Sequence, residues 1–413
     1  MVVNSLKYFF ISLFVGCASY TQQNAEMRYA FYNGDYEKSQ NELEDLELQT
    51  SNTDELLYYL ENGSLATRRG RSRDARRSFD IAKKLVDDSY TTSISSTTAS
   101  FFINDSSQVY YPEDYEQVAI HTMAALSWLE DQNLEGARVE AKRINSRLDQ
   151  LKNNDHLYHK DGFAWLLSAL VFESNGDIDD AIIDYRKSLD AYETSYGRFS
   201  PSGVPDVLIE SFYRLAKQKN RHKDIERLKP YSPKHIRPLH SSLVVIHERG
   251  HIDIKRSKDF FITLNNELIR FSFPYIHHPI WGSVDYHRVE TANQHVEADL
   301  MVHMNALAHT SLEDRRGRLI AKGFVRLAAK SAMIQEARQA FGPIGGTIAN
   351  LITTATETAD TRSWSLLPQR FYMSRLWLKP GKHIVKVFSS PERYKTHHIE
   401  VGSNQILFLR DWD

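Results

Sequence analysis

The sequence is poor in cysteine and carries no large excess of charge. Cys17 is the only cysteine in 413 residues, so an intramolecular disulfide and a cysteine-based zinc site are both excluded. With 51 Lys and Arg against 53 Asp and Glu, the net charge is -2, and the electrostatic basis for binding nucleic acid is missing. Beyond the N-terminus no apolar run is long enough for a membrane-spanning helix. The chain is nevertheless long enough to form two or more domains.

The first twenty residues have the pattern of an export signal. Lys7 is followed by the apolar run Tyr8–Val15, which is too short to cross a bilayer, and then by a small residue and Cys17. This segment resembles the signal peptide and lipobox of bacterial lipoproteins, with Phe14 where leucine is usual. The resemblance implies that residues 1–16 are removed and that Cys17 is lipidated, so acyl chains would hold the protein to the membrane. The alternatives are an ordinary cleaved signal peptide and a buried N-terminal strand.

Residues 17–229 are expected to form a helical domain built from repeats. Small and aromatic residues follow a fixed pattern of offsets at Gly63, Gly70, Ala75, Phe79 and Ala82. Such self-similarity is typical of helical repeats, in which a two-helix unit buries its apolar side only against its neighbours. The same offsets recur within Met27–Leu46, Ala125–Ile144 and Ala169–Ser188.

These offsets resemble the tetratricopeptide repeat family. The resemblance implies that a small residue lets paired helices approach, that a glycine turns the chain, and that an alanine-aromatic-alanine stripe packs on the next unit. It also implies a concave groove that binds peptides or partner proteins and is not itself catalytic. An irregular helical bundle is the alternative.

Residues 89–114 interrupt the expected repeats. The segment is too polar for a repeat helix and too aromatic for a simple linker, so we expect an ordered insertion whose Phe101, Phe102 and Tyr110 pack on the helices. A loop that binds a partner is the alternative. A final helix at Asp206–Leu228 is expected to cap the array.

Residues 230–413 are expected to form an α+β domain after a proline-containing linker. The apolar run Leu243–Ile246 and the alternation in Ile252–Lys255 predict strands, and residues 312–340 have helical spacing up to a break at Gly342. Strands on both sides of central helices place this domain in the α+β class. A second helix is expected at Thr347–Thr358, and further strands at Glu267–Phe273, Ser283–Glu290, Val296–Met301, Phe371–Leu378, His383–Phe388, His397–Val401 and Ile406–Leu409.

Four segments stand out as recognisable, namely Gly16–Tyr20, Leu243–Gly250, Ala359–Pro368 and Leu378–His383. With them, the chain is similar over nearly its whole length to a family of bacterial outer-membrane lipoproteins that have N-terminal tetratricopeptide-like helices and a C-terminal α+β domain. The similarity implies the periplasmic side of the outer membrane and, as partners, other envelope proteins such as lipoproteins related to activators of penicillin-binding proteins. It defines no biochemical activity.

The segment His247–His251 matches the H-E-x-x-H pattern of zinc proteases. That pattern binds zinc because a helix places both imidazoles on one face with the glutamate beside them. Here strand-forming residues precede the motif and a glycine lies within it, so we expect a hairpin turn at Glu248–Gly250 and no metal. Because the chain has 17 histidines, a histidine-based metal site in the C-terminal domain is the alternative.

Two further features are candidates for contact with partners. Asp360, Arg362 and Trp364 place a charged pair beside a tryptophan before a strand, which favours a packed, ion-paired corner over a partner-binding site. The small, apolar stretch Gly342–Leu351 could touch a membrane or a partner, but we favour a helix break followed by a short buried helix. No residue is assigned a catalytic role, and no cofactor or metal ligand is expected.

The sequence therefore predicts a non-enzymatic, lipid-anchored scaffold that binds envelope proteins through a helical groove, in cell-wall or surface assembly. A metal-dependent envelope hydrolase that uses the histidine-rich C-terminal domain is the alternative. A glycan-binding module with exposed Trp281 and Trp377 is a third reading.

Overall fold

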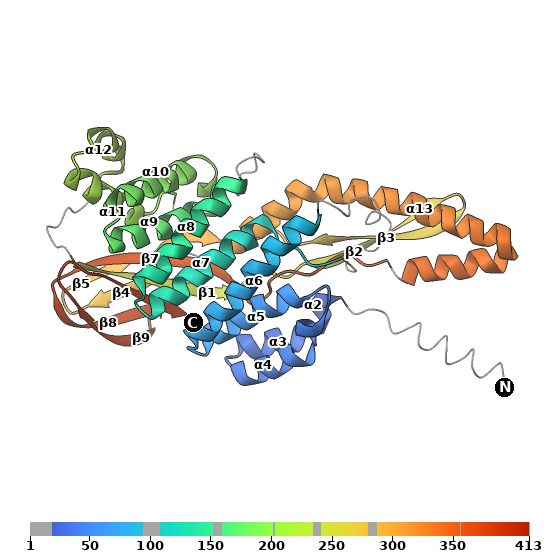
Figure 1. Ribbon diagram of the computed structural model, residues 1–413, viewed down its shortest axis with the longest axis horizontal. Coiled ribbons are helices and arrows are strands. Elements are labelled where there is room, and N and C mark those ends of the chain that lie inside the picture. Colours follow the sequence, from blue (N-terminus) through green and yellow to red (C-terminus); the bar gives the residue numbers. More distant parts are fainter. Residues whose placement is uncertain are drawn as a thin grey trace.

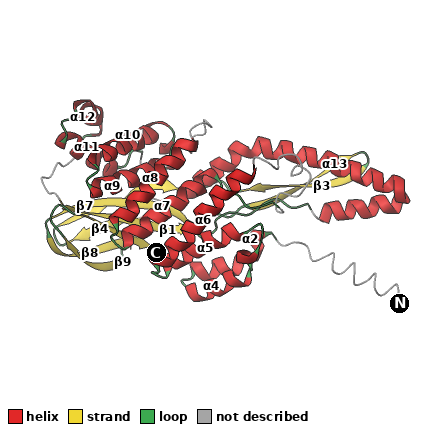
Figure 2. Ribbon diagram, viewed as in Figure 1, coloured by secondary structure: helices red, strands yellow, loops and turns green. Residues whose placement is uncertain are grey.

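The computed structural model describes residues 19–93, 108–151, 159–200, 203–233, 241–279, 287–355 and 357–412. Within these ranges the first half of the chain is helical, and the second half combines strands with one very long helix (Figures 1 and 2). The predicted class, helices followed by a mixed strand and helix region, is confirmed. The signal peptide and Cys17 lie outside the described residues, so their assignment stays a prediction.

The helices of the first half are joined in pairs by tight turns. Each of the five turns contains a residue with a left-handed backbone, at Gly34, Gly70, Gln132, Gly176 and Asn220. Glycine adopts this conformation without steric cost, and the first four positions are those that the sequence offsets align. The pairs are α3 (Ala25–Tyr32) with α4 (Tyr36–Asp45), α5 (Glu55–Arg68) with α6 (Ser72–Ser93), α7 (Asp114–Glu130) with α8 (Leu134–Leu151), α9 (Gly162–Asn175) with α10 (Ile178–Thr194), and α11 (Asp206–Gln218) with α12 (His222–Leu228).

The recurring small residue is explained by helix packing. A Cβ atom at Gly63 of α5 would lie 2.4 Å from the Phe79 ring of α6, so only glycine permits this approach. Ala75 and Ala82 on either side of Phe79 are fully buried. The spacing read from the sequence therefore corresponds to real contacts between α5 and α6.

Two boundaries in the helical half differ from expectation. Helix α6 continues to Ser93, past the predicted start of the insertion at residue 89. Tyr110 is buried against the helices as predicted, whereas Phe101 and Phe102 lie outside the described residues. The expected single capping helix at Asp206–Leu228 is two helices, because the chain turns at Asn220.

The second half contains two four-stranded sheets. The first has the order β10-β1-β7-β6, with β1 parallel to β10 and antiparallel to β7, and the second has the order β5-β4-β8-β9. The strands are β1 (Ser241–His251), β4 (Arg288–Thr291), β5 (Gln294–Glu297), β6 (Asp299–His303), β7 (Pro368–Leu378), β8 (Gly381–Ser390), β9 (Arg393–Val401) and β10 (Ile406–Trp412).

Strand β1 is buried on both faces, which explains the unbroken apolar run Leu243–Ile246. Leu243 and Val245 pack against residues of the second sheet, whereas Val244 and Ile246 belong to the core that includes the helices. The body of the molecule is thus layered: helices, first sheet, second sheet (Figure 1). One hydrophobic core contains residues from both halves of the chain.

Several predicted strands are placed differently. Residues 252–255 are irregular because Asp253 and Ile254 bond to the Asn305 and Asp253 side chains instead of a neighbouring strand. The expected strand Val296–Met301 is split between β5 and β6. Of the expected strand at residues 283–290, residues 283–286 lie outside the described ranges.

An arm projects from the layered body (Figures 1 and 2). It consists of the hairpin of β2 (Arg256–Leu264) and β3 (Glu267–Tyr275) lying along helix α13 (Met304–Ala355). Before the chain reverses at Gly342, with φ 69° and ψ -168°, the helix runs for about 57 Å. The arm has its own small core, formed by Ile269, Phe271, Leu327 and Ile334. No helix in the described ranges is both long and apolar enough to span a bilayer.

Candidate functional site

The predicted corner of Asp360, Arg362 and Trp364 lies between the helices and the first sheet. Nη1 of Arg362 donates to Asp54 Oδ1 and to the Gln108 carbonyl, at 2.8 Å each, while Nε donates to Asp360 Oδ1 at 2.9 Å. Burial opposes the charge of Arg362, but hydrogen bonds and attraction from Asp360 and Asp54 outweigh it and raise its pKa. The arginine therefore ties the segment before β7 to the start of α5.

Trp364 completes this corner inside the helical array. Its side chain is fully buried, and its Nε1 donates to Ser64 Oγ on α5 at 2.9 Å. Its backbone N–H donates to Glu116 Oε1 on α7 at 2.8 Å, and its ring lies 5.7 Å from that of Phe79. Arg362 and Trp364 are thus packed and buried, whereas the side chain of Asp360 is 29% exposed.

Glu61 of α5 holds the next residues of the same segment. Its carboxylate accepts hydrogen bonds from the backbone N–H groups of Ser365 and Leu366, at 2.7 and 2.9 Å. It also accepts bonds from the Ser365 hydroxyl and the Tyr20 phenol. Burial raises the pKa of Glu61 to about 7, although these four bonds act in the opposite direction. The inner face of α5–α7 is thus occupied by the chain's own residues 362–366.

Buried ion pairs also connect the helices of the first half to the second half of the chain. Glu173 of α9 binds the guanidinium of Arg375 on β7 through two hydrogen bonds of 2.6 and 3.0 Å and also pairs with Arg214. Burial opposes ionisation of Glu173, but the two arginines outweigh it and lower its pKa. Lys255 is held in the same way by Glu113, the N-cap residue of α7, at 2.7 Å.

Sequence reasoning missed these pairs. The two partners of Glu173–Arg375 are 202 residues apart, and those of Lys255–Glu113 are 142 apart. Glu173 is the only charged residue of the otherwise apolar α9, and Glu113 lies at the N-cap of α7. Neither position indicates the distant cation with which it pairs. Only the assembled helices and sheet show that these carboxylates face inward.

The H-E-x-x-H segment lies on a strand, and the predicted turn at Glu248–Gly250 is wrong. Strand β1 continues to His251, pairing Arg249 with Arg370 and His251 with Pro368 of β7, while Gly250 takes a left-handed φ of 61°. Glu248 is kept inside the strand by two buried cations, Arg410 at 2.6 Å and Arg68 at 3.2 Å. Their charges make a buried glutamate tolerable where the sequence suggested a turn.

The two histidines of this segment have separate surroundings. His247 is buried between the two sheets, with Nδ1 2.8 Å from Asp411 Oδ2, whereas His251 stacks on Tyr32 with ring centroids 3.4 Å apart. Four residues of strand place them about 13 Å apart along the backbone, unlike the single helical face of a zinc protease. Among the described residues, no group of three His, Cys, Asp or Glu side chains is placed to hold a metal ion.

A small pocket of about 410 Å³ lies where the arm meets the body. Its lining includes His251, His277 and His278 together with Tyr32 and Asn305. His251 belongs to the H-E-x-x-H segment, and no local pattern in the sequence places His277 and His278 beside it. Burial, followed by the nearby charges of Arg28 and Arg68, lowers the pKa of His251 and so disfavours its protonated form.

Of the two tryptophans considered for glycan binding, the structure describes Trp377. Trp377, expected to be exposed, is only 7% exposed, and its ring is covered by the guanidinium groups of Arg375 and Arg214. Cation–π packing against both arginines explains its burial near the end of β7. Trp281 lies outside the described residues.

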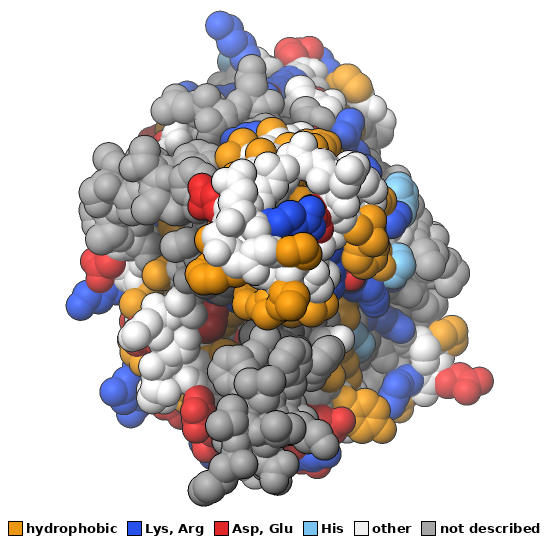
Figure 3. Space-filling view, turned by 90° about the vertical axis from the view of Figure 1, so that its right-hand side faces the viewer, with side chains coloured by type: hydrophobic (Ala, Val, Ile, Leu, Met, Phe, Trp, Pro, Cys, Tyr) orange, Lys and Arg blue, Asp and Glu red, His pale blue; other side chains and the backbone are white. Residues whose placement is uncertain are grey.

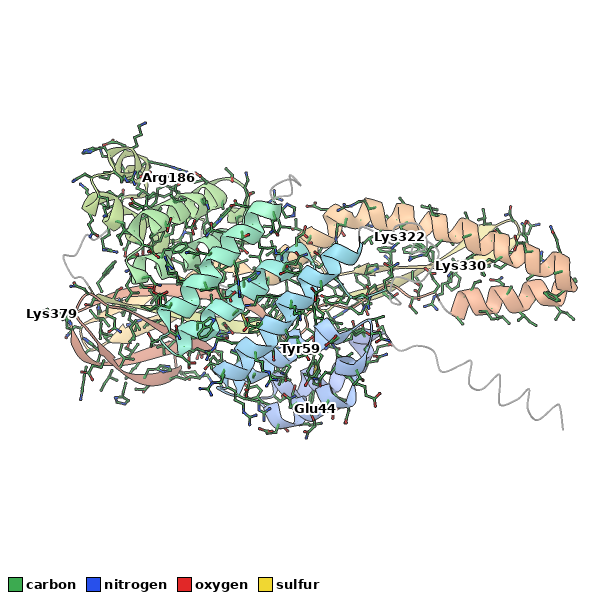
Figure 4. The ribbon with its side chains drawn as sticks, in the orientation of Figure 1. Glu44, Tyr59, Arg186, Lys322, Lys330 and Lys379 are labelled. Atoms are coloured by element: carbon green, nitrogen blue, oxygen red, sulfur yellow. The ribbon has the colours of Figure 1, made fainter. Side chains whose placement is uncertain are left out.

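A groove of about 550 Å³ remains open on the helices α4, α5 and α6. Figure 4 shows Glu44 and Tyr59, two of its lining residues, on the α4 and α5 side of the body. A chain of hydrogen bonds crosses it: Asn62 Nδ2 donates to Ser78 Oγ at 2.8 Å, and Gln40 Nε2 donates to Asn62 Oδ1 at 3.2 Å. Its walls carry charges of both signs, including Arg69, Arg71, Arg77, Glu37 and Asp74.

Comparisons with known proteins leave the class of the protein open. No protein-family model matches the chain, and no curated protein matches its sequence. Among solved structures, the crystal structure of BtubC (BKLC) from P. vanneervenii aligns with 52% of this chain and 82% of that chain. The sequence identity is 14% and the TM-score is 0.34, so this likeness carries no argument about fold or function.

Proposed function

We propose that the protein is a non-enzymatic scaffold, anchored by a lipid at Cys17 to the periplasmic side of the outer membrane, that binds an envelope protein. The open groove on α4–α6 is the observation that carries this proposal. The paired helices, their left-handed turns and the close contact between Gly63 and Phe79 support a tetratricopeptide-like array. Such arrays bind extended segments of other proteins.

The lining of the groove suits an extended polypeptide. The Gln40 and Asn62 amides can each donate and accept hydrogen bonds, as the backbone of a bound segment requires. The rings of Tyr58 and Tyr59 add apolar contact area beside them. Because the inner face of α5–α7 is filled by residues 362–366, the groove on α4–α6 is the surface we assign to a partner.

Site-specific crosslinking tests the groove. A photo-crosslinking amino acid at Tyr59 is expected to capture a partner in intact cells, and the same amino acid at Tyr29 is the control. Tyr29 is 65% exposed on α3 but does not line the groove. The purified partner should then bind an Asn62→Ala variant about tenfold more weakly. The reason is that polar groups buried by the bound segment would lose their hydrogen bonds to the Asn62 amide. Equal capture at both positions would contradict the proposal.

The lipid anchor has an independent test. Cys17→Ser should abolish acyl labelling and move the protein out of the membrane fraction, because lipidation requires the cysteine thiol. Unchanged processing, fractionation and labelling would remove the lipoprotein part of the proposal while leaving the groove untouched.

A second candidate function is metal-dependent hydrolysis; His251, His277 and His278 line one pocket, but among the described residues they are not placed to hold a metal ion together. Elemental analysis of the chain from Ala18 onward, which contains every described residue, separates the two candidates. Stoichiometric zinc that is lost in His251→Ala would support the hydrolase. Zinc below one-tenth of an equivalent, unchanged by that substitution, would support the scaffold.

A further inference from the structure

The last part of α13 has its apolar side chains on the outside. After the reversal at Gly342, the helix returns along the arm, and Ile344, Ile348 and Leu351 are exposed by 74, 47 and 55%. Facing the arm instead are Gly346 and Thr353, which are buried. The predicted short buried helix in Gly342–Leu351 is therefore wrong, because its contacts with the rest of the arm are made by its small and polar residues.

Polar bonds hold this returning segment in place. Asn350 Nδ2 donates to Glu267 Oε2 of β3 at 3.1 Å, and Lys330 Nζ donates to the Thr353 carbonyl at 3.1 Å. Arg338, just before the reversal, pairs with Glu267. A helix on the surface of a water-soluble protein has the opposite pattern, with its polar side chains facing the solvent. The exposed isoleucines and leucine are thus an inverted face whose surroundings in use must be apolar.

The returning segment itself carries no charge, although the 45% exposed side chain of Arg338 and its partner Glu267 lie beside it. From Gln339 to Thr356 the sequence contains no Lys, Arg, Asp or Glu, and at the reversal Phe341 is 77% exposed. Viewed end-on, the tip shows hydrophobic side chains on several sides of the arm, not on one flank alone (Figure 3). Exposed apolar patches mark contacts with proteins or with membranes, and binding to a membrane surface grows with apolar area and with attraction to anionic lipids.

The stem behind the tip is basic. Residues 256–275 and 313–357 together contain ten Lys and Arg against six Asp and Glu, whereas the rest of the chain contains 41 against 47. Lys322 and Lys330 lie along the arm, away from the body (Figure 4). The formal net charge of these two ranges is +4, and two of their cations pair with acids outside the ranges, Arg256 with Asp253 and Arg315 with Glu113. Basic groups next to an apolar tip favour the headgroups of anionic lipids.

We infer that the tip of the arm, centred on Phe341 and Ile344, inserts into the surface of an anionic lipid bilayer. The insertion is shallow, since no helix in the described ranges can cross a membrane. It provides a second membrane contact that requires no lipid on Cys17. The inference is thus independent of the proposed anchor and of the partner groove.

Single-cysteine labelling tests the insertion directly. The chain from Ala18 onward has no cysteine, so Phe341→Cys gives one site for an environment-sensitive fluorophore. On vesicles of phosphatidylglycerol and phosphatidylethanolamine its emission should rise several-fold, shift to the blue and be quenched by spin-labelled acyl chains. Ile384→Cys on β8 is the matched control, because Ile384 is also a large exposed aliphatic residue, at 54%, but lies on the second sheet. Its emission should stay constant.

Co-sedimentation with the same vesicles measures the contribution of the tip. Ile344→Ser should weaken binding roughly tenfold, because one isoleucine side chain moved out of water accounts for about one decade in affinity. Ile384→Ser should bind as the unchanged protein does, and vesicles of phosphatidylcholine alone should bind more weakly.

Two results would overturn the inference. The first is equal binding of the Ile344→Ser and Ile384→Ser variants, or no binding at all. The second is a change in emission at position 341 that follows protein concentration without vesicles, together with dimers in sedimentation equilibrium. That second result would assign the tip to contact between two copies of the chain.

Discussion

In the layered body charged side chains lie inside and are paired, whereas in the arm apolar side chains lie outside. Glu173 and Arg375 are both nearly inaccessible to solvent, and each satisfies the other across the boundary between α9 and β7. On the arm, Phe341 and Ile344 point into solvent while Asn350 and Thr353 make the internal contacts. The two regions therefore depart from the usual distribution of polarity in opposite directions.

This difference between body and arm distinguishes side chains that stabilise the fold from side chains that are available for binding. A buried ion pair contributes little net stability but is costly to break, so it fixes how the helices sit on the sheet. An exposed apolar face contributes little to the isolated fold and marks a surface that contacts a protein or a membrane. Substitutions in the body should thus change stability, and those at the arm tip should change binding.

The largest expected effect comes from removing a carboxylate between the helices and the sheet. Glu173→Ala leaves the buried guanidinium of Arg375 without its acceptor, and the Tyr185 hydroxyl also loses its partner. The free energy of unfolding should fall by about 3–5 kcal/mol, measured by urea denaturation.

The control for this variant is an exposed pair on the same array. Asp179→Ala removes the partner of Arg221, and both side chains are largely exposed. The cost should stay below about 0.5 kcal/mol. If the two variants cost the same, the buried pair does not fix the position of the sheet.

A smaller loss is expected at the carboxylate that holds residues 365 and 366. Glu61→Ala leaves the N–H groups of Ser365 and Leu366 without an acceptor in a buried site. The free energy of unfolding should fall by about 1–3 kcal/mol. Hydrogen exchange at these two amides should become faster in the variant, while amides of α13 should be unchanged; equal protection in both proteins would contradict the assigned role.

The pH dependence of stability gives a third comparison. Asp299 of β6 accepts a hydrogen bond from the Val207 N–H at the start of α11, and burial raises its pKa from 3.8 to about 7. Between these two pH values Asp299 is protonated in the folded chain and ionised in the unfolded chain. Folding therefore takes up a proton, and the free energy of unfolding falls as the pH rises from about 4 to about 7.

Asp299→Asn removes this titration and keeps a side-chain oxygen for Val207. Denaturation midpoints of the unchanged protein should therefore fall more steeply between pH 5 and pH 8 than those of the variant. The difference should be of the order of 1 kcal/mol. Parallel curves would show that Asp299 is already charged at pH 5.

Local patterns predicted local structure well in this chain. The offsets around Gly63 and Gly70 correspond to a close helix contact and a left-handed turn, and the apolar run Leu243–Ile246 is a strand buried on both faces. Each of these features is encoded within a few residues by backbone freedom or by alternation.

Features that depend on distant residues were predicted poorly. The turn expected at Glu248–Gly250 is a strand because Arg68 and Arg410, from other parts of the chain, neutralise Glu248. The corner of Arg362 and Trp364 was recognised as packed, but its partners on α5 and α7 had no signal in the sequence. The exposure of Ile344 was missed because an apolar helix normally indicates burial.

The smallest expected effect on stability is at the arm tip. Ile344→Ser should change the free energy of unfolding by less than about 0.5 kcal/mol, because the side chain is 74% exposed and buries little area on folding. Ile334, on the same helix but fully buried in the core of the arm, is its matched control. Ile334→Ser should loosen the arm and speed its cleavage by a protease, whereas Ile344→Ser should not. If Ile344→Ser also destabilised the arm, the outward face would belong to the fold after all, and the contrast between body and arm would disappear.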